Sequence, residues 1–109
     1  MKYLIGMDGG STKTKCVLTD INLKPICETS GGPSNFLVIG TETVAETILN
    51  LVNECVLSQK FSLEDIEAIV LGTTGGGRRN DAELLEKKIF EDAKQKSLTI
   101  NKFRVESDA

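Results

Sequence analysis

The chain has 109 residues, 39% of them hydrophobic, which suits one ordinary domain with a single modest core. Its 13 lysines and arginines are spread along the sequence and are outnumbered by 16 aspartates and glutamates, for a net charge of -3. Without a basic cluster, a nucleic-acid partner is not expected. No apolar run approaches the roughly 20 residues of a membrane span, so no membrane partner is expected. The apolar stretch within residues 1–7 is too short for the hydrophobic region of a signal peptide.

The three cysteines, Cys16, Cys27 and Cys55, are odd in number and lack C-x-x-C spacing. Each lies in a segment with the pattern of an apolar strand or helix. Buried, reduced thiols are the simplest interpretation, with metal binding or redox chemistry as alternatives. Reduced thiols fit a cytoplasmic location.

The first third of the chain predicts three consecutive strands. Residues 2–8 are apolar and residues 12–20 alternate in part, and the Gly9-Gly10 pair between them can adopt the positive φ angles of a tight hairpin. Residues 23–30 form a weaker candidate strand. Because Pro25 lacks an N–H donor, this third strand is expected at a sheet edge.

A loop over residues 31–35 precedes the first predicted helix, whose apolar residues recur at helical spacing. These are Val44, Ile48, Leu51, Val52, Cys55 and Val56. Ser62 and Asp65 have the spacing of a cap for a short turn. Residues 66–72 then form a nearly continuous apolar run, which predicts a strand buried on both faces.

The glycine-rich residues 73–79 lead into a second helix, whose start is predicted at Asn80 from the glutamate three residues later. This helix should extend to about Lys96, and residues 99–105 predict a last strand. The order is three strands, helix, strand, helix, strand, which indicates an α/β fold with a mixed sheet. The first, fourth and fifth strands should be parallel, with the hairpin antiparallel to them.

Ligands of open α/β sheets bind beyond the carboxyl ends of the parallel strands. Three unusual segments should meet there: residues 8–12, residues 72–79 and Asp108. Backbone N–H groups, hydroxyls and one ammonium could make an anion-binding turn from Gly9, Gly10, Ser11, Thr12 and Lys13. Asp8 at its base could hold Mg²⁺ directly or through water. The alternative is a plain hairpin with a solvated aspartate.

The other two segments also have a functional and a structural interpretation. Three successive glycines, Gly75, Gly76 and Gly77, suggest close approach of backbone to a ligand, with Arg78 or Arg79 contacting an anionic group. A surface turn with solvated arginines is the alternative. Asp108 could act as a general base on a substrate hydroxyl, or cap a following helix.

Four segments in this order resemble the actin-like ATPases, within the group that joins N-acetylglucosamine kinases with the BadF/BadG/BcrA/BcrD activator ATPases. Residues 5–14 resemble the first phosphate motif, and residues 71–79 resemble the glycine-rich segment after the fourth strand. The loop Gly32-Pro33-Ser34-Asn35 resembles the sugar-contacting loop. Residues 106–109 resemble the strand end that carries the catalytic aspartate, here Asp108.

The resemblance implies a ribonuclease H-like fold that uses ATP and Mg²⁺. In the kinase branch, Ser34 and Asn35 would contact a small sugar, with an amino sugar expected, and Asp108 would deprotonate its hydroxyl. The other substrate-side candidates are Gly75, Gly76, Gly77 and Arg78. The activator branch couples ATP hydrolysis to electron transfer through a cluster whose cysteines would lie after residue 109. The kinase branch is favoured because it uses the Asp-Gly-Gly, Pro-Ser-Asn and Asp108 features together.

Family members carry a second phosphate motif, an adenosine site and a second lobe, none of which is found in these 109 residues. We therefore expect residues 1–109 to be a truncated N-terminal subdomain that does not turn over ATP alone. It should leave an apolar surface or a sheet edge uncovered. A non-catalytic binding module is a further alternative. A homodimer is one assembly that the full-length protein could form.

Overall fold

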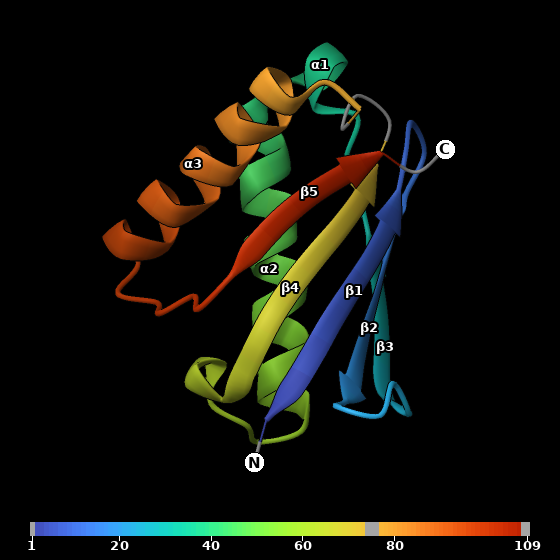
Figure 1. Cartoon of the computed structure of the whole chain (residues 1–109), viewed down its shortest axis with the longest axis vertical. Helices are drawn as coiled ribbons and strands as arrows, with labels where there is room; N and C mark the ends of the chain where they lie inside the picture. The colour runs from blue at the N-terminus through green and yellow to red at the C-terminus, as the bar shows by residue number, and fades with distance from the viewer. Residues whose placement is uncertain (1, 74–76, 108–109) are drawn as a thin grey trace.

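The computed structural model describes residues 2–73 and 77–107, in which five strands form one sheet in the order β3-β2-β1-β4-β5 (Figure 1). The strands are β1 Tyr3–Gly9, β2 Thr14–Asp20, β3 Pro25–Gly31, β4 Ile66–Thr73 and β5 Phe103–Ser107. The first three are joined antiparallel, whereas β1, β4 and β5 are parallel. The predicted mixed sheet is confirmed, with β3 at an edge.

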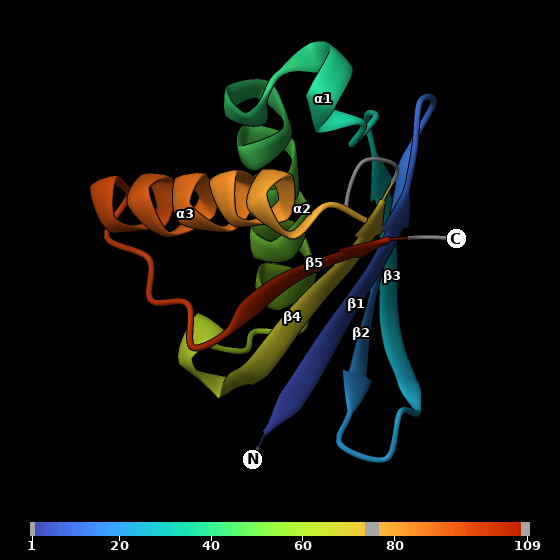
Figure 2. The same ribbon diagram turned by 45° about the horizontal axis from the view of Figure 1, so that its top comes forward.

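The two long helices lie on the same face of the sheet, as Figure 2 shows. The helical elements are α1 Phe36–Ile39, α2 Thr41–Ser58, the 3₁₀ turn η1 Leu63–Asp65, and α3 Arg79–Gln95. Helix α2 buries the predicted apolar stripe, and α3 packs against α2 and β5. Along residues 2–73 and 77–107, no helix has both the length and the apolar character needed to cross a membrane.

Strand alternation divides the side chains between a covered and an uncovered face. Tyr3, Ile5 and Met7 of β1 are buried beneath the helices, so the intervening residues point to the other face. The prediction that β4 is buried on both faces is wrong, because Val70 is 42% exposed and no described helix covers that face. With Leu23 also 69% exposed, the expected uncovered apolar surface is confirmed.

Local contacts fix one element boundary, and two other boundaries differ from the prediction. The predicted cap before β4 is confirmed, because the Ser62 hydroxyl accepts the Glu64 N–H at 3.3 Å and the Asp65 carboxylate accepts the Ser62 N–H at 3.2 Å. The predicted start of α3 at Asn80 is wrong, since the helix begins at Arg79 without a side-chain cap. The last strand begins at Phe103, four residues later than expected.

Candidate functional site

The carboxyl ends of the parallel strands lie in one row that crosses the whole sheet. Gly31 of β3 is paired with Thr14 of β2, and Thr14 with Gly9 of β1. Gly9 is in turn paired with Thr73 of β4, and Thr73 with Ser107 of β5. The strands that precede the three predicted segments, β1, β4 and β5, are therefore adjacent, with their ends in register.

The turn between β1 and β2 has a different geometry from the one expected. Its ends are closed by a hydrogen bond from the Gly10 N–H to the Lys13 carbonyl, 3.2 Å long. The predicted hairpin is confirmed, but neither Gly9 nor Gly10 has a positive φ, so the expectation of positive φ angles in its turn is wrong. The four-residue loop makes such angles unnecessary. Because Gly10 uses its N–H in the turn, the N–H groups of Ser11, Thr12 and Lys13 are left without a hydrogen-bond acceptor among the described residues.

The loop of residues 32–35, which we call the Ser34 loop, is docked directly on this turn. The Ser34 N–H donates to the Gly10 carbonyl at 2.9 Å. The Thr73 hydroxyl donates to the Ser34 carbonyl at 3.0 Å. Since that hydroxyl has a single proton, the Ser34 hydroxyl is the donor in the 2.8 Å bond between the two side chains. Ser34 and Thr73 are fully buried, so these bonds hold three chain segments together.

Glycine is required at position 9 because of this docking. A Cβ atom added to Gly9 would lie 2.2 Å from the Ser34 Oγ and 2.6 Å from the Thr14 Oγ1, much closer than atoms can approach. Gly6, on the same strand, has open space at the corresponding position. Gly9 therefore serves close approach between segments, and not the positive φ angle that the sequence suggested for it.

Two buried oxygen atoms next to this junction lack a hydrogen-bond partner within residues 2–73 and 77–107. They are the Oγ1 of Thr14, whose side chain is fully buried beside Gly9, and the Oδ1 of Asn35 in the Ser34 loop. Buried polar atoms are rarely left unpaired in folded proteins. Both atoms are therefore candidates for contact with a bound molecule.

Asp8 lies at the same end of the sheet but on the opposite face from Ser34. Its side chain is exposed, and strand alternation separates it from buried Met7 and from Gly9. No described residue forms an ion pair with it. One exposed carboxylate beside a polar turn fits Mg²⁺, an ion that keeps several of its waters. The described residues contain no cluster of three or more acidic, histidine or cysteine side chains that could hold a metal ion.

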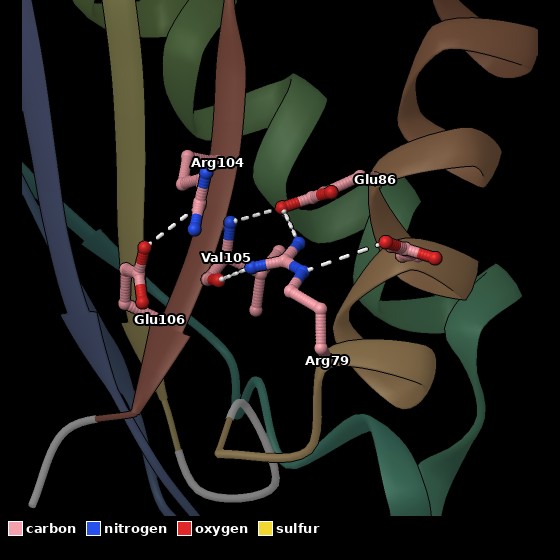
Figure 3. Close-up of polar contacts among 6 residues, drawn as sticks. Arg79, Glu86, Arg104, Val105 and Glu106 are labelled. Carbon is pink, nitrogen blue, oxygen red and sulfur yellow. Dashed lines mark hydrogen bonds and ion pairs between the residues drawn. The ribbon is translucent and has the colours of Figure 1, made fainter.

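At the β5 end of the row of strand ends, charged side chains join α3 to β5, as Figure 3 shows. Arg79, at the start of α3, pairs with Glu86, which lies two helical turns further along the same face, and donates to the Val105 carbonyl at 3.2 Å. Glu86 also accepts the Val105 N–H at 2.8 Å. Both backbone polar groups of Val105 are thus paired, and the pKa of Arg79 is raised, chiefly by its hydrogen bond to Glu86. This Arg79–Glu86 clamp fixes the start of α3 to β5.

Several sequence-predicted residues lie elsewhere or cannot be placed. Ser11, Thr12 and Lys13 are exposed in the turn, and Gly77 and Arg78 are exposed just before α3. Gly75, Gly76 and Asp108 lie outside the described residues. Arg104 and Glu106 form an ion pair of 2.7 Å on the last described strand before Asp108 (Figure 3).

Sequence reasoning missed Thr14, Thr73 and the role of Arg79. The first two could have been found from the strand pattern, because each is a polar residue in phase with buried apolar ones. Thr14 aligns with Cys16 and Leu18, and Thr73 aligns with Leu71. The partners of Arg79 come from α3 and β5, and no spacing in the sequence indicates them.

Known proteins with similar sequences identify the family of this chain. Residues 5–109 match the BadF/BadG/BcrA/BcrD ATPase family along almost the whole chain. The chain belongs to this family. The N-acetylmuramic acid/N-acetylglucosamine kinase of Clostridium acetobutylicum is 36% identical over 89 residues. That match covers 82% of the chain but only 29% of the kinase, so the chain spans less than a third of this relative.

Solved structures support the assignment of the fold. A protein from Chromobacterium violaceum described as an N-acetylglucosamine kinase superposes with a TM-score of 0.67 at 21% identity, over 99% of this chain and 35% of its own. A reductive activator for a corrinoid, iron-sulfur protein gives 0.57 at 13% identity, over 95% and 22%. At these identities the likeness concerns the fold alone, which is the predicted actin-like ATPase fold.

Proposed function

We propose that this family member is the N-terminal, phosphate-binding part of an ATP-dependent sugar kinase, which transfers the γ-phosphoryl group of ATP to a hydroxyl of an amino sugar. The observation that carries the proposal is the docking of the Ser34 loop on the turn after β1. It joins the candidate sugar loop to the candidate phosphate loop through Ser34, Gly10 and Thr73. The 36% identity to an amino-sugar kinase supports the same conclusion.

On the phosphate side, the turn offers N–H groups and hydroxyls rather than a dense positive charge. The N–H groups of Ser11 and Thr12 are candidate donors to phosphate oxygens, and exposed Lys13 adds one positive charge nearby. Mg²⁺, held by Asp8 through water, would neutralise charge on the phosphates during transfer. Gly9 contributes by letting Ser34 approach, and Gly10 by closing the turn.

On the sugar side, Asn35 is the leading candidate for a direct contact. Its Oδ1 is buried and accepts no hydrogen bond from the described residues, so it could accept one from a sugar hydroxyl or an acetamido N–H. The hydroxyl and the carbonyl of Ser34 are hydrogen-bonded to Thr73, and its N–H is hydrogen-bonded to Gly10. We therefore assign Ser34 to positioning the loop and Asn35 to recognition.

The base is proposed to be Asp108, which directly follows the end of β5. Ser107, which precedes Asp108, is in register with Thr73, the last described residue before the glycines. A carboxylate at that point could accept the proton of the attacking sugar hydroxyl. Gly75, Gly76, Gly77 and Arg78 are proposed to line the intervening space. Cytoplasmic location remains part of this proposal.

The test uses the polypeptide that contains this chain together with the second lobe of its relatives. ATP-dependent phosphorylation should be measured with N-acetylglucosamine, N-acetylmuramic acid and glucose, and Asp108→Asn should lower kcat about 10²- to 10⁴-fold. Glu64→Gln is the control, because Glu64 is exposed near the amino end of β4. The 109-residue chain alone should not turn over ATP.

Other outcomes would favour the alternatives. ATP hydrolysis that no sugar stimulates, with full activity in Asp108→Asn, would support an activator ATPase. A protein that contains both lobes but binds no ATP would support a non-catalytic module. Unchanged sugar phosphorylation in Asp108→Asn would remove Asp108 from the role of base while leaving the kinase assignment intact.

A further inference from the structure

The three cysteines, far apart in the sequence, lie in a chain of contacts between the sheet and α2. The Cys16 Sγ on β2 is 3.8 Å from the Cys55 Sγ on α2. The Cys55 Sγ is also 3.8 Å from the Cys27 Sγ on β3. Cys55 is therefore the middle member, with one thiol on each side. Among the described side chains, no group of three or more His, Cys, Asp or Glu could hold a metal ion.

The hydrogen bonds around Cys55 have a defined direction. The Ser58 hydroxyl donates its only proton to the Cys55 carbonyl at 2.8 Å, so the Cys27 thiol is the donor in the 3.3 Å contact with Ser58 Oγ. The Cys55 thiol donates to Cys27. The Thr29 hydroxyl, 3.4 Å from Cys55, is then left to donate to the Cys55 sulfur. Donors directed at the Cys55 sulfur favour negative charge on it.

Exposure to solvent distinguishes the three thiols. Cys16 and Cys55 are fully buried, whereas Cys27 is half-buried on the edge strand β3. Burial raises the pKa of Cys16 to about 12 and also raises that of Cys55. An oxidant from solvent therefore meets Cys27 first. The thiol adjacent to an oxidised Cys27 is Cys55.

We propose that Cys27 and Cys55 form an oxidisable pair that a hydroperoxide converts into a disulfide between β3 and α2. In the first step the Cys27 sulfur attacks a peroxide oxygen, the O–O bond breaks, and a sulfenic acid and an alcohol or water form. In the second, the Cys55 sulfur attacks the Cys27 sulfur and displaces hydroxide, which leaves as water with the Cys55 proton. Two thiols are oxidised and one hydroperoxide is reduced.

The geometry favours this pair over Cys16 and Cys55, although the sulfur separations are equal. Closing either disulfide requires the sulfurs to approach from 3.8 Å to about 2.0 Å. Strand β2 is hydrogen-bonded on both sides, by β1 and β3, whereas β3 is paired only with β2 among the described strands. Cys27 can therefore move with less disturbance than Cys16.

The experiment treats the reduced chain with hydrogen peroxide, blocks remaining thiols by alkylation, and maps disulfides by mass spectrometry. Cleavage at aspartate and glutamate separates the cysteines, because Asp20 lies between Cys16 and Cys27 and Glu28 lies before Cys55. We expect a Cys27–Cys55 cross-link, one free thiol at Cys16, and full reversal by dithiothreitol. The matched control Cys16→Ser should form the same cross-link, and Cys27→Ser should lose it.

Three results would overturn the proposal. One is a disulfide that forms as fast in Cys27→Ser as in the unmodified chain. Another is oxidation of Cys27 to sulfinic acid with both other thiols left free. The third is cross-linking only between chains. Since Cys27 is half-buried, Cys27→Ser should keep the fold, which circular dichroism checks. The result does not depend on ATP or sugar, so it is independent of the proposed kinase activity.

Discussion

The β1 end and the β5 end of the row of strand ends are held by different kinds of contact. On the side of β1, the Ser34 loop is held by uncharged groups that are fully buried, with Ser34 and Thr73 as the central pair. On the side of β5, the clamp uses the charged pair Arg79 and Glu86, whose side chains are 39% and 16% exposed. The first junction depends on shape and on unbroken hydrogen bonds, whereas the second tolerates solvent.

The largest effect is expected from Gly9→Ala, which forces a Cβ atom against Ser34 and Thr14. Overpacking of this kind destabilises by about 1 to 3 kcal/mol, and the Ser34 loop should be displaced. Urea unfolding measures the loss. Gly6→Ala is the matched control, because its Cβ meets open space, and it should change stability by no more than about 0.5 kcal/mol. Equal losses in the two variants would contradict the close-packed junction.

Thr73→Val should have the next largest effect, since it keeps the shape but removes the hydroxyl. The Ser34 hydroxyl would lose its acceptor inside a buried site, and the Ser34 carbonyl would lose one of its two donors and keep the Phe36 N–H. Leaving such groups unpaired costs about 1 to 3 kcal/mol. The exposed helical Thr43→Val serves as the control in the same denaturation experiment. A neutral Thr73→Val would mean that water replaces the hydroxyl and that the junction is not dry.

A smaller effect is expected from Glu86→Gln on the charged side. The amide can accept one hydrogen bond but not attract the guanidinium of Arg79, so the edge of β5 should loosen and the melting temperature should fall by less than in Thr73→Val. Hydrogen exchange at the Val105 N–H reports the change directly. Glu83→Gln is the control, since Glu83 is 61% exposed and 3.8 Å from Arg79. Unchanged protection of Val105 would contradict the clamp.

The smallest loss of stability below pH 10 is expected from ionisation of the buried Cys16 thiol on β2. Because burial raises the pKa of Cys16 from 9.0 to about 12, the folded state keeps its proton where the unfolded chain loses it. Stability should therefore be complete below pH 9 and fall as pH rises from 9 to 12, by roughly 1 kcal/mol at pH 9.5. Cys16→Ala should have a smaller slope in urea titrations, because buried Cys55 still titrates there. Lysines titrate in both proteins, so the difference between the two slopes reports the removal of Cys16.

The sequence predicted the sheet but not the contacts that join its loops. Parallel strands bring their carboxyl ends together whatever the loops contain, so the convergence of Gly9, Thr73 and Ser107 followed from strand order. The docking of Ser34 did not follow, because it depends on packing between segments that no periodicity relates. For the same reason the need for Gly9 was assigned to backbone angle when it comes from a neighbouring hydroxyl.

The start of α3 illustrates a local signal that tertiary contacts override. Asn80 with Glu83 has the spacing of a capping box, yet the helix begins one residue earlier. Arg79 is held there by Glu86 and the Val105 carbonyl, which come from the next helical turns and from β5. A cap read from sequence cannot include partners that are brought together only by the fold.

The row of strand ends also sets a constant distance between the loops that follow the strands. Neighbouring strands lie about 4.8 Å apart, so Gly9 and Ser107, which are two strands apart, are separated by about 10 Å whatever the loops beyond them contain. Loop sequence can therefore vary to suit different ligands while the span from the β1 turn to the end of β5 stays constant. A ligand whose reacting atoms match that span needs no movement of the sheet to reach both ends.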